Sequence, residues 1–172
     1  MEIKEMKNAE VAIYHFLEKN QIDYYFVASD STFLFDYFDA SGEINSFLID
    51  ASHEESFTVT VSSLFATKPN SDEYYRALIL FNKLRFCPGF ENSAFAIDES
   101  GVFVHMQKVN CQGIELTEDY LKKVTFTPLT EFILLAPAIK KFVFEGQNLD
   151  LELLIAEGFI EALMEIKDAL DE

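Results

Sequence analysis

Glycine is scarce in this chain, with 6 Gly among 172 residues. No Gly-x-Gly-x-x-Gly sequence, Walker-type phosphate loop or Gly-x-Ser-x-Gly nucleophile elbow occurs. Those motifs need glycine because the backbone must pass close to a phosphate group or turn sharply at a nucleophile. The sequence therefore gives no basis for a nucleotide-binding or hydrolase site, and we expect no bound cofactor.

Cysteine and long apolar runs are also scarce. Cys87 and Cys111 stand alone, fit no metal-ligand spacing and are expected to be reduced thiols. The apolar run Phe132–Ala138 is far shorter than the roughly 20 residues of a membrane-spanning helix. Residues Met1–Lys7 alternate in charge and lack the apolar core of a signal peptide. We therefore expect a cytoplasmic protein that does not bind or cross a membrane.

Basic residues are few: 13 Lys and Arg stand against 30 Asp and Glu, a net charge of −17. No Lys or Arg occurs between Lys19 and Lys68. So acidic a chain disfavours nucleic-acid phosphates and favours a basic protein partner. The carboxylates that we predict to bind such a partner are Asp36, Asp39, Glu43, Asp50, Glu54 and Glu55. A purely solubilising role for this charge stays open.

The first half of the chain predicts one helix and an antiparallel meander. Residues 8–20 show a helical stripe that contains Val11, Tyr14 and Leu17. Runs rich in aromatic and β-branched residues follow at 24–27, 32–38, 43–51 and 57–62, separated by turn residues. In such a sheet Asp36 and Asp50 are candidates to face each other across neighbouring strands.

A second helix is predicted after Asn70, which has the capping-box spacing to Glu73. Its apolar stripe is expected to comprise Tyr74, Leu78, Phe81 and Leu84, and the Cys87-Pro88-Gly89 corner is expected to end it. Two strands follow at 93–97 and 102–108. The turns at 39–42 and 98–101 share the pattern Asp-x-Ser-Gly, which is typical of a hairpin with a type I turn.

Helices are predicted for the rest of the chain. One runs from 118 to 124 with Thr117 as its N-cap, and a separate one starts at Thr127-Pro128 and ends near Phe142, kinked or broken at Pro137. A last helix covers 149–170. Short turns between strands favour an antiparallel sheet, so the class is α+β, in the order α-β-β-β(-β)-α-β-β-α. We expect one domain over residues 1–146, with the helix in 147–172 packed on it.

Histidine and cysteine offer only weak catalytic or metal candidates. His15, His53 and His105 lie on a predicted helix, turn and strand without metal-ligand spacing, and His53-Glu54-Glu55 resembles an exposed turn more than a metal site. A nucleophilic Cys87 with His105 as its base needs a pocket that joins both to a carboxylate. We therefore predict no catalytic residue and no metal ligand from the sequence.

From the central helix onward, the chain resembles the YbjN family, whose fold is shared with type III secretion chaperones. The resembling stretches are Leu80-Phe81-Asn82-Lys83-Leu84 and the hairpin Phe95-Ala96-Ile97-Asp98-Glu99-Ser100-Gly101-Val102. With the preceding meander, the resemblance covers roughly residues 8–142. This resemblance implies an α+β fold that often forms a dimer. It supplies no known catalytic residues that could be assigned to this chain. Secretion chaperones of this fold are acidic dimers that wrap an extended client segment.

Three functional hypotheses follow. The first is a non-enzymatic, YbjN-like protein that binds a basic or apolar protein segment, as a chaperone or regulator. Whether such a protein forms a homodimer stays open. The second is an immunity- or inhibitor-type protein whose acidic surface blocks one basic enzyme. The third is an enzyme whose site the sequence does not reveal.

Overall fold

The computed structural model describes residues 8–38, 44–63, 69–86, 90, 93–97 and 102–147. The elements are α1 (Asn8–Lys19), β1 (Tyr25–Val27), β2 (Thr32–Phe38), β3 (Ile44–Asp50), β4 (Ser56–Ser63), α2 (Ser71–Leu84), β5 (Ser93–Ile97), β6 (Phe103–Asn110), α3 (Glu118–Ala138) and the π-helix η1 (Ile139–Phe144). The predicted Asp-x-Ser-Gly turns, the Cys87-Pro88-Gly89 corner and the helix at 149–170 lie outside the described residues.

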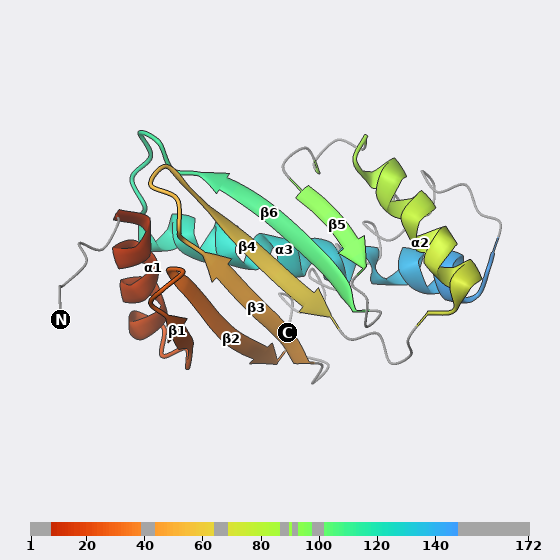
Figure 1. Ribbon diagram of the computed structural model, residues 1–172, viewed down its shortest axis with the longest axis horizontal. Coiled ribbons are helices and arrows are strands. Elements are labelled where there is room, and N and C mark those ends of the chain that lie inside the picture. The colour runs from red at the N-terminus through yellow and green to blue at the C-terminus, as the bar shows by residue number, and fades with distance from the viewer. Residues whose placement is uncertain are drawn as a thin grey trace, which may run out of the picture.

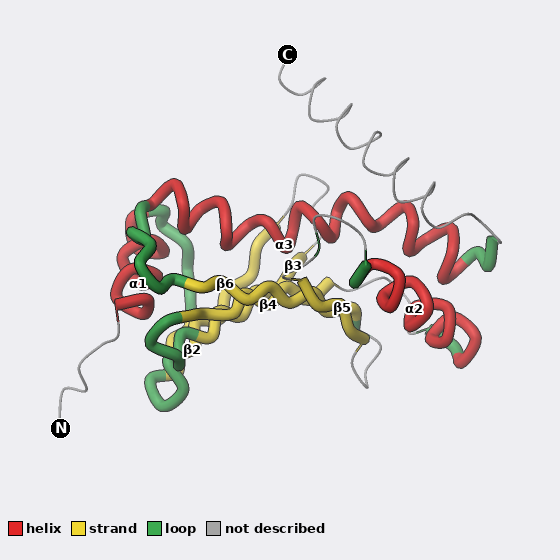
Figure 2. Tube along the Cα trace, turned by 90° about the horizontal axis from the view of Figure 1, so that it is seen from above, coloured by secondary structure: helices red, strands yellow, loops and turns green. Residues whose placement is uncertain are grey.

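The strands form one six-stranded sheet in the order β1-β2-β3-β4-β6-β5, and every neighbouring pair is antiparallel. α3 runs across one face of this sheet, from the end near α1 to the end near α2 (Figure 1). α1 lies on the same side as α3 (Figure 2). The predicted α+β class, with an antiparallel sheet packed against helices, is confirmed.

The alternation of buried and half-buried residues along the strands indicates which face of the sheet the helices cover. Phe57, Val59 and Val61 of β4 are fully buried, whereas the two threonines between them are only half-buried. Phe33 and Phe35 of β2 share this face, because the strand register places them opposite buried residues of β3. Side chains of successive strand residues point to opposite faces, so one face of each strand is apolar and packs under the helices.

The core consists of two apolar clusters along the sheet. One joins α1 and the first half of α3 to β2, β3 and β4, and its largest fully buried side chains include Phe33, Phe47 and Phe57. The other joins α2, η1 and the second half of α3 around Phe103 of β6. α3 contributes to both clusters and so ties the two ends of the sheet together.

The cap of α2 is confirmed, but its predicted stripe is partly wrong. The Asn70 side chain accepts hydrogen bonds from the backbone N–H of Asp72 and Glu73, and the Glu73 carboxylate accepts one from the Asn70 N–H at 2.7 Å. The buried residues are Ala77, Leu80, Phe81 and Leu84. Two of the four expected stripe residues, Tyr74 and Leu78, are exposed. Packing against η1 and β5 selects a face rotated from the expected one.

The two helices predicted on either side of Thr127 are one continuous helix, α3. Pro128 lies inside it and is buried on the sheet. A proline in a helix removes one backbone donor, yet the burial of a stripe that includes Leu121, Leu129 and Leu135 outweighs that loss. The helix does not break at Pro137 either. It widens after Ala138 into η1, which ends at Phe144. The Glu145 N–H donates to the Lys140 carbonyl, and Gly146, with a φ of +63°, follows.

Candidate functional site

The sheet has a second face, which we call the open face, turned away from α1 and α3. Within the described part of the chain, no helix lies over it (Figure 2). The strand register carries one row of side chains across all six strands on this face: Tyr25, Leu34, Leu48, Thr60, Met106 and Ala94. We call these six residues the central row.

The central row is apolar but not enclosed. Tyr25 is 69 % exposed and Leu34 is 37 % exposed, while Leu48, Thr60 and Met106 are half-buried. A row of partly exposed, mainly apolar side chains is a feature of surfaces that bind another chain. The rows on either side are mainly Ser, Thr and small aliphatic residues. Their charged members are Asp36 on one side and Asp50 and Lys108 on the other.

The six predicted partner-binding carboxylates do not form one cluster. Asp36 and Asp50 both lie on the open face, but the expectation that they face each other is wrong. Asp36 is paired with Ser46, and Asp50 with Thr32 and Thr58. Four residues of strand separate their positions, which corresponds to about 13 Å. Each carboxylate is held by a local hydrogen bond: Asp36 accepts from the Ser46 hydroxyl at 2.7 Å, and Asp50 from the Ser52 N–H at 2.8 Å.

The other four carboxylates lie elsewhere. Glu54 and Glu55 are exposed in the turn between β3 and β4, at one end of the sheet. Asp39 and Glu43 lie outside the described residues. The structure therefore brings Asp36 and Asp50 to the open face, beside the central row. Asp50, the last residue of β3, lies at the end of the sheet that carries Glu54 and Glu55, whereas Asp36 lies four positions farther along the sheet.

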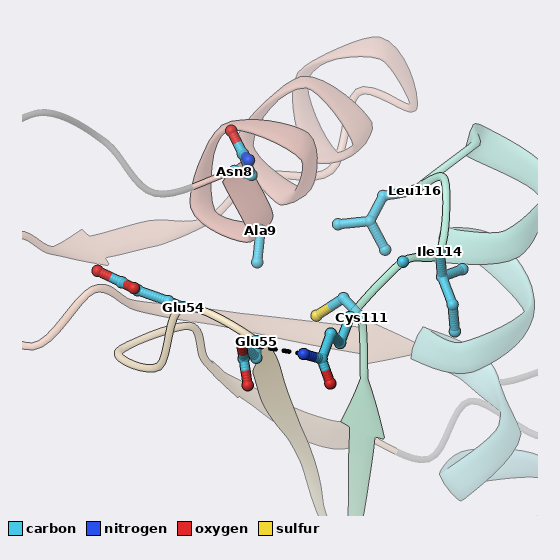
Figure 3. A pocket seen from close by; sticks show the side chains of 9 residues that line it. Asn8, Ala9, Glu54, Glu55, Cys111, Ile114 and Leu116 are labelled. Carbon is cyan, nitrogen blue, oxygen red and sulfur yellow. Dashed lines mark hydrogen bonds between the residues drawn. The ribbon is translucent and has the colours of Figure 1, made fainter.

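Glu54 and Glu55 line a pocket of about 380 Å³ between α1 and the segment that follows β6 (Figure 3). The Cys111 side chain and Leu116 face Ala9 of α1 across it (Figure 3). Partial burial raises the pKa of the Cys111 thiol above its usual value, so the protonated and weakly nucleophilic form is favoured. Cys111 is a free thiol that packs against the core cluster under α1.

His105 belongs to a buried polar cluster that joins the sheet to α3. Its side chain is fully buried, and its ring stacks on Phe95 at a centroid distance of 4.2 Å. Nδ1 lies 2.9 Å from the Pro128 carbonyl oxygen, which only accepts hydrogen bonds, so Nδ1 carries a proton and donates it. Nε2 lies 3.0 Å from Oε2 of Glu131.

Glu131 is the centre of this cluster. Its Oε2 also accepts a hydrogen bond from the Ser93 hydroxyl at 3.0 Å. Nε2 and Oε2 approach each other closely without forming a hydrogen bond of regular geometry.

This arrangement differs from a nucleophilic triad. In a triad the histidine stands between the hydroxyl and the carboxylate, whereas here Ser93 and His105 contact the same Glu131 oxygen. The cluster fastens β5 and β6 to the middle of α3. Sequence reasoning singled out His105 but missed Glu131 and Ser93, whose distant sequence positions carry no signal. Cys87, the predicted nucleophile, lies outside the described residues.

No metal site is found among the residues that the structure describes: they contain no group of three or more His, Cys, Asp or Glu side chains placed to hold an ion. His53, the metal candidate of the sequence, is exposed in the β3–β4 turn. None of the described helices combines the length and the hydropathy needed to span a membrane.

Tyr24, next to β1, gives a prediction for pH dependence. Its hydroxyl donates to Oε1 of Glu18 at 2.8 Å, and partial burial followed by this hydrogen bond raises the pKa of Tyr24 to about 12. Because the folded protein favours the neutral phenol, its contribution to stability is complete below pH 10 and is lost as the pH rises toward 12. In a titration followed by ¹³C NMR of the tyrosine rings, Tyr24 should ionise last, and Glu18→Gln should lower its midpoint. A Tyr24 midpoint at the usual value of about 10 would contradict this geometry.

A search against protein-family models and a search of curated proteins found no match to this chain.

Proposed function

We propose that this protein is a non-enzymatic, acidic protein-binding module, with a chaperone-like or regulatory role, that holds a basic or apolar segment of a partner on the open face of its sheet. The observation that carries the proposal is the central row, an apolar line across six strands with Asp36 and Asp50 beside it. Binding of an extended segment requires apolar contacts but no fixed sequence motif, which agrees with the lack of a recognised motif in the sequence.

Two further features support this proposal. The element order is helix, meander, helix, hairpin and helix, which is the order that the resemblance to the YbjN family implies. The net charge of −17 would speed the association of a basic segment by electrostatic steering. We further propose a cytoplasmic location, which the free thiol of Cys111 supports.

The proposal predicts a preference that a peptide array measures. Labelled protein is incubated with immobilised 15-residue peptides that combine Lys or Arg with apolar residues, and with matched peptides in which Asp or Glu replaces the basic residues. The basic peptides should retain several times more protein, and the preference should shrink between 50 and 300 mM salt, because salt screens exposed charges. Equal retention of basic and acidic peptides would refute the electrostatic part of the proposal.

Matched variants test which carboxylates act. Asp36→Asn combined with Asp50→Asn keeps the acceptor oxygens for Ser46 and Ser52 but removes both charges from the open face. This double variant should lose most of the preference for basic peptides. The control variant, Glu54→Gln combined with Glu55→Gln, removes the same amount of charge from the end of the sheet. It should retain more of the preference for basic peptides. The reverse ranking would move the binding surface away from the open face.

A further inference from the structure

A second pocket lies at the outer edge of the sheet, where α1 ends and β1 begins. It has a volume of about 530 Å³, within the range of small-ligand pockets, and is lined by Glu18, Gln21, Ile22 and residues 23–26. β1 pairs only with β2 in the described sheet, so the pocket runs along a strand edge that no other described strand covers. We call it the edge pocket.

Three aromatic side chains contribute to the edge pocket. Tyr24 and Phe26 pack toward the helices, with ring centroids 5.7 Å and 4.7 Å from that of Phe33. Tyr25 points to the opposite face of β1 and is 69 % exposed. The core thus fixes two of the rings, while the third presents its ring to solvent at the end of the central row, opposite Leu34.

The charged side chains that line the edge pocket are both acidic. Glu18 and Asp23 contribute carboxylates, and the lining contains no Lys, Arg or His. One oxygen of Glu18 accepts the hydrogen bond from Tyr24. Lys19, the neighbouring basic residue on α1, forms an ion pair with Glu118 of α3. The pocket therefore combines negative charge with an exposed aromatic ring.

We propose that the edge pocket binds the cationic side chain of one Lys or Arg residue of the partner segment. This inference rests on the proposed function, because it assigns one subsite to the same partner. A guanidinium or ammonium group is attracted to the face of a tyrosine ring and to carboxylates, and its aliphatic stem packs against an apolar side chain such as Ile22. Tyr25 belongs to both the edge pocket and the central row, so a segment lying along the row reaches the pocket at its β1 end.

The test uses the full chain and a small probe. ¹⁵N-labelled protein is titrated with Nα-acetyl-arginine amide, and separately with Nα-acetyl-citrulline amide, its neutral near-isostere, at equal ionic strength. The arginine compound should shift the amide signals of residues 23–26 with half-saturation at tens of millimolar, as expected for a single side chain. The citrulline compound should shift them much less. Equal shifts with both compounds would overturn the proposal.

Two variants sharpen the test. Tyr25→Leu should weaken binding of the arginine compound about fivefold, since it removes the cation–π contact. Tyr75→Leu changes a tyrosine of matching exposure, 66 %, on α2 and should leave binding unchanged. Equal weakening by both variants, or by neither, would count against the pocket.

The peptide array separates this inference from the proposed function. Peptide binding that prefers basic sequences, without any arginine-specific shift at residues 23–26, would refute the edge pocket and leave the open face standing. Arginine-specific shifts in a protein without peptide preference would refute the proposed function and leave the pocket standing.

Discussion

Replacing Glu131 with Ala is expected to lower the free energy of unfolding by about 3 kcal/mol. The variant leaves His105 fully buried and without the carboxylate that faces its Nε2, and it removes the acceptor of the Ser93 hydroxyl. Urea denaturation followed by circular dichroism at pH 7 measures the change. Glu115→Ala, in an exposed loop, serves as the control and should change stability by less than about 0.5 kcal/mol.

A double-mutant cycle separates the polar interaction from simple packing. His105→Leu combined with Glu131→Leu removes both polar partners, and replacing both members of a buried polar pair by apolar residues of similar shape is often nearly neutral. The double variant should therefore be at least about 1 kcal/mol more stable than the sum of the two single effects predicts. Additive effects would show that the two side chains do not interact, in contradiction to the 3.0 Å contact.

Replacing Leu34 and Leu48 together by Thr is expected to weaken binding of the best array peptide about 10- to 30-fold, or about 1.4–2 kcal/mol. The two side chains are neighbours in the central row, and Leu34 is 37 % exposed. Threonine retains a high strand propensity, so the strands should persist. Fluorescence anisotropy with a labelled peptide gives the dissociation constants.

The control for this effect lies on α2, which packs against β5 and η1 beyond one edge of the sheet (Figure 1). Leu78 of α2 is 46 % exposed, and Leu78→Gln removes a comparable apolar side chain away from the open face. Its peptide affinity should equal that of the unchanged protein. Equal affinity in the Leu34→Thr, Leu48→Thr variant would show that the central row does not contact the peptide.

Features set by neighbouring residues were predicted well from the sequence. The capping box of Asn70 and Glu73 is confirmed, as is the N-cap Thr117, whose hydroxyl accepts from the Tyr120 N–H. The strand alternation in β4 is confirmed too. Such features depend on hydrogen bonds and periodicity within a few residues, which the sequence displays directly.

Features set by tertiary packing were predicted less well. Thr127 and Pro128 have the residue types of a helix start, yet they lie within α3, because the sheet buries the helix on both sides of them. The stripe of α2 was misplaced for a related reason: a helical repeat fits several faces, and the core contacts choose one. In both cases local propensity competed with the burial of apolar surface and lost.

The candidate site shows the same difference between features set by neighbouring residues and features set by tertiary packing. Asp36 and Asp50 were recognised as candidates, but their separation depends on strand register, which follows from pairing across the whole sheet. Glu131 was missed as the partner of His105 because the two residues are 26 positions apart and lie in different elements, α3 and β6. The edge pocket likewise combines Glu18 of α1 with the aromatic residues of β1, a combination that appears only when helix and strand meet.

We expect a partner segment to lie on the open face. The most direct measurement is a methyl NMR experiment in which a nitroxide-labelled array peptide is bound to the protein. The methyl signals of Leu34, Leu48 and Met106 should broaden strongly, while those of Leu78 on α2 and Ile133 on α3 should remain sharp. Broadening at Leu78 or Ile133, with the three central-row signals unaffected, would contradict the account.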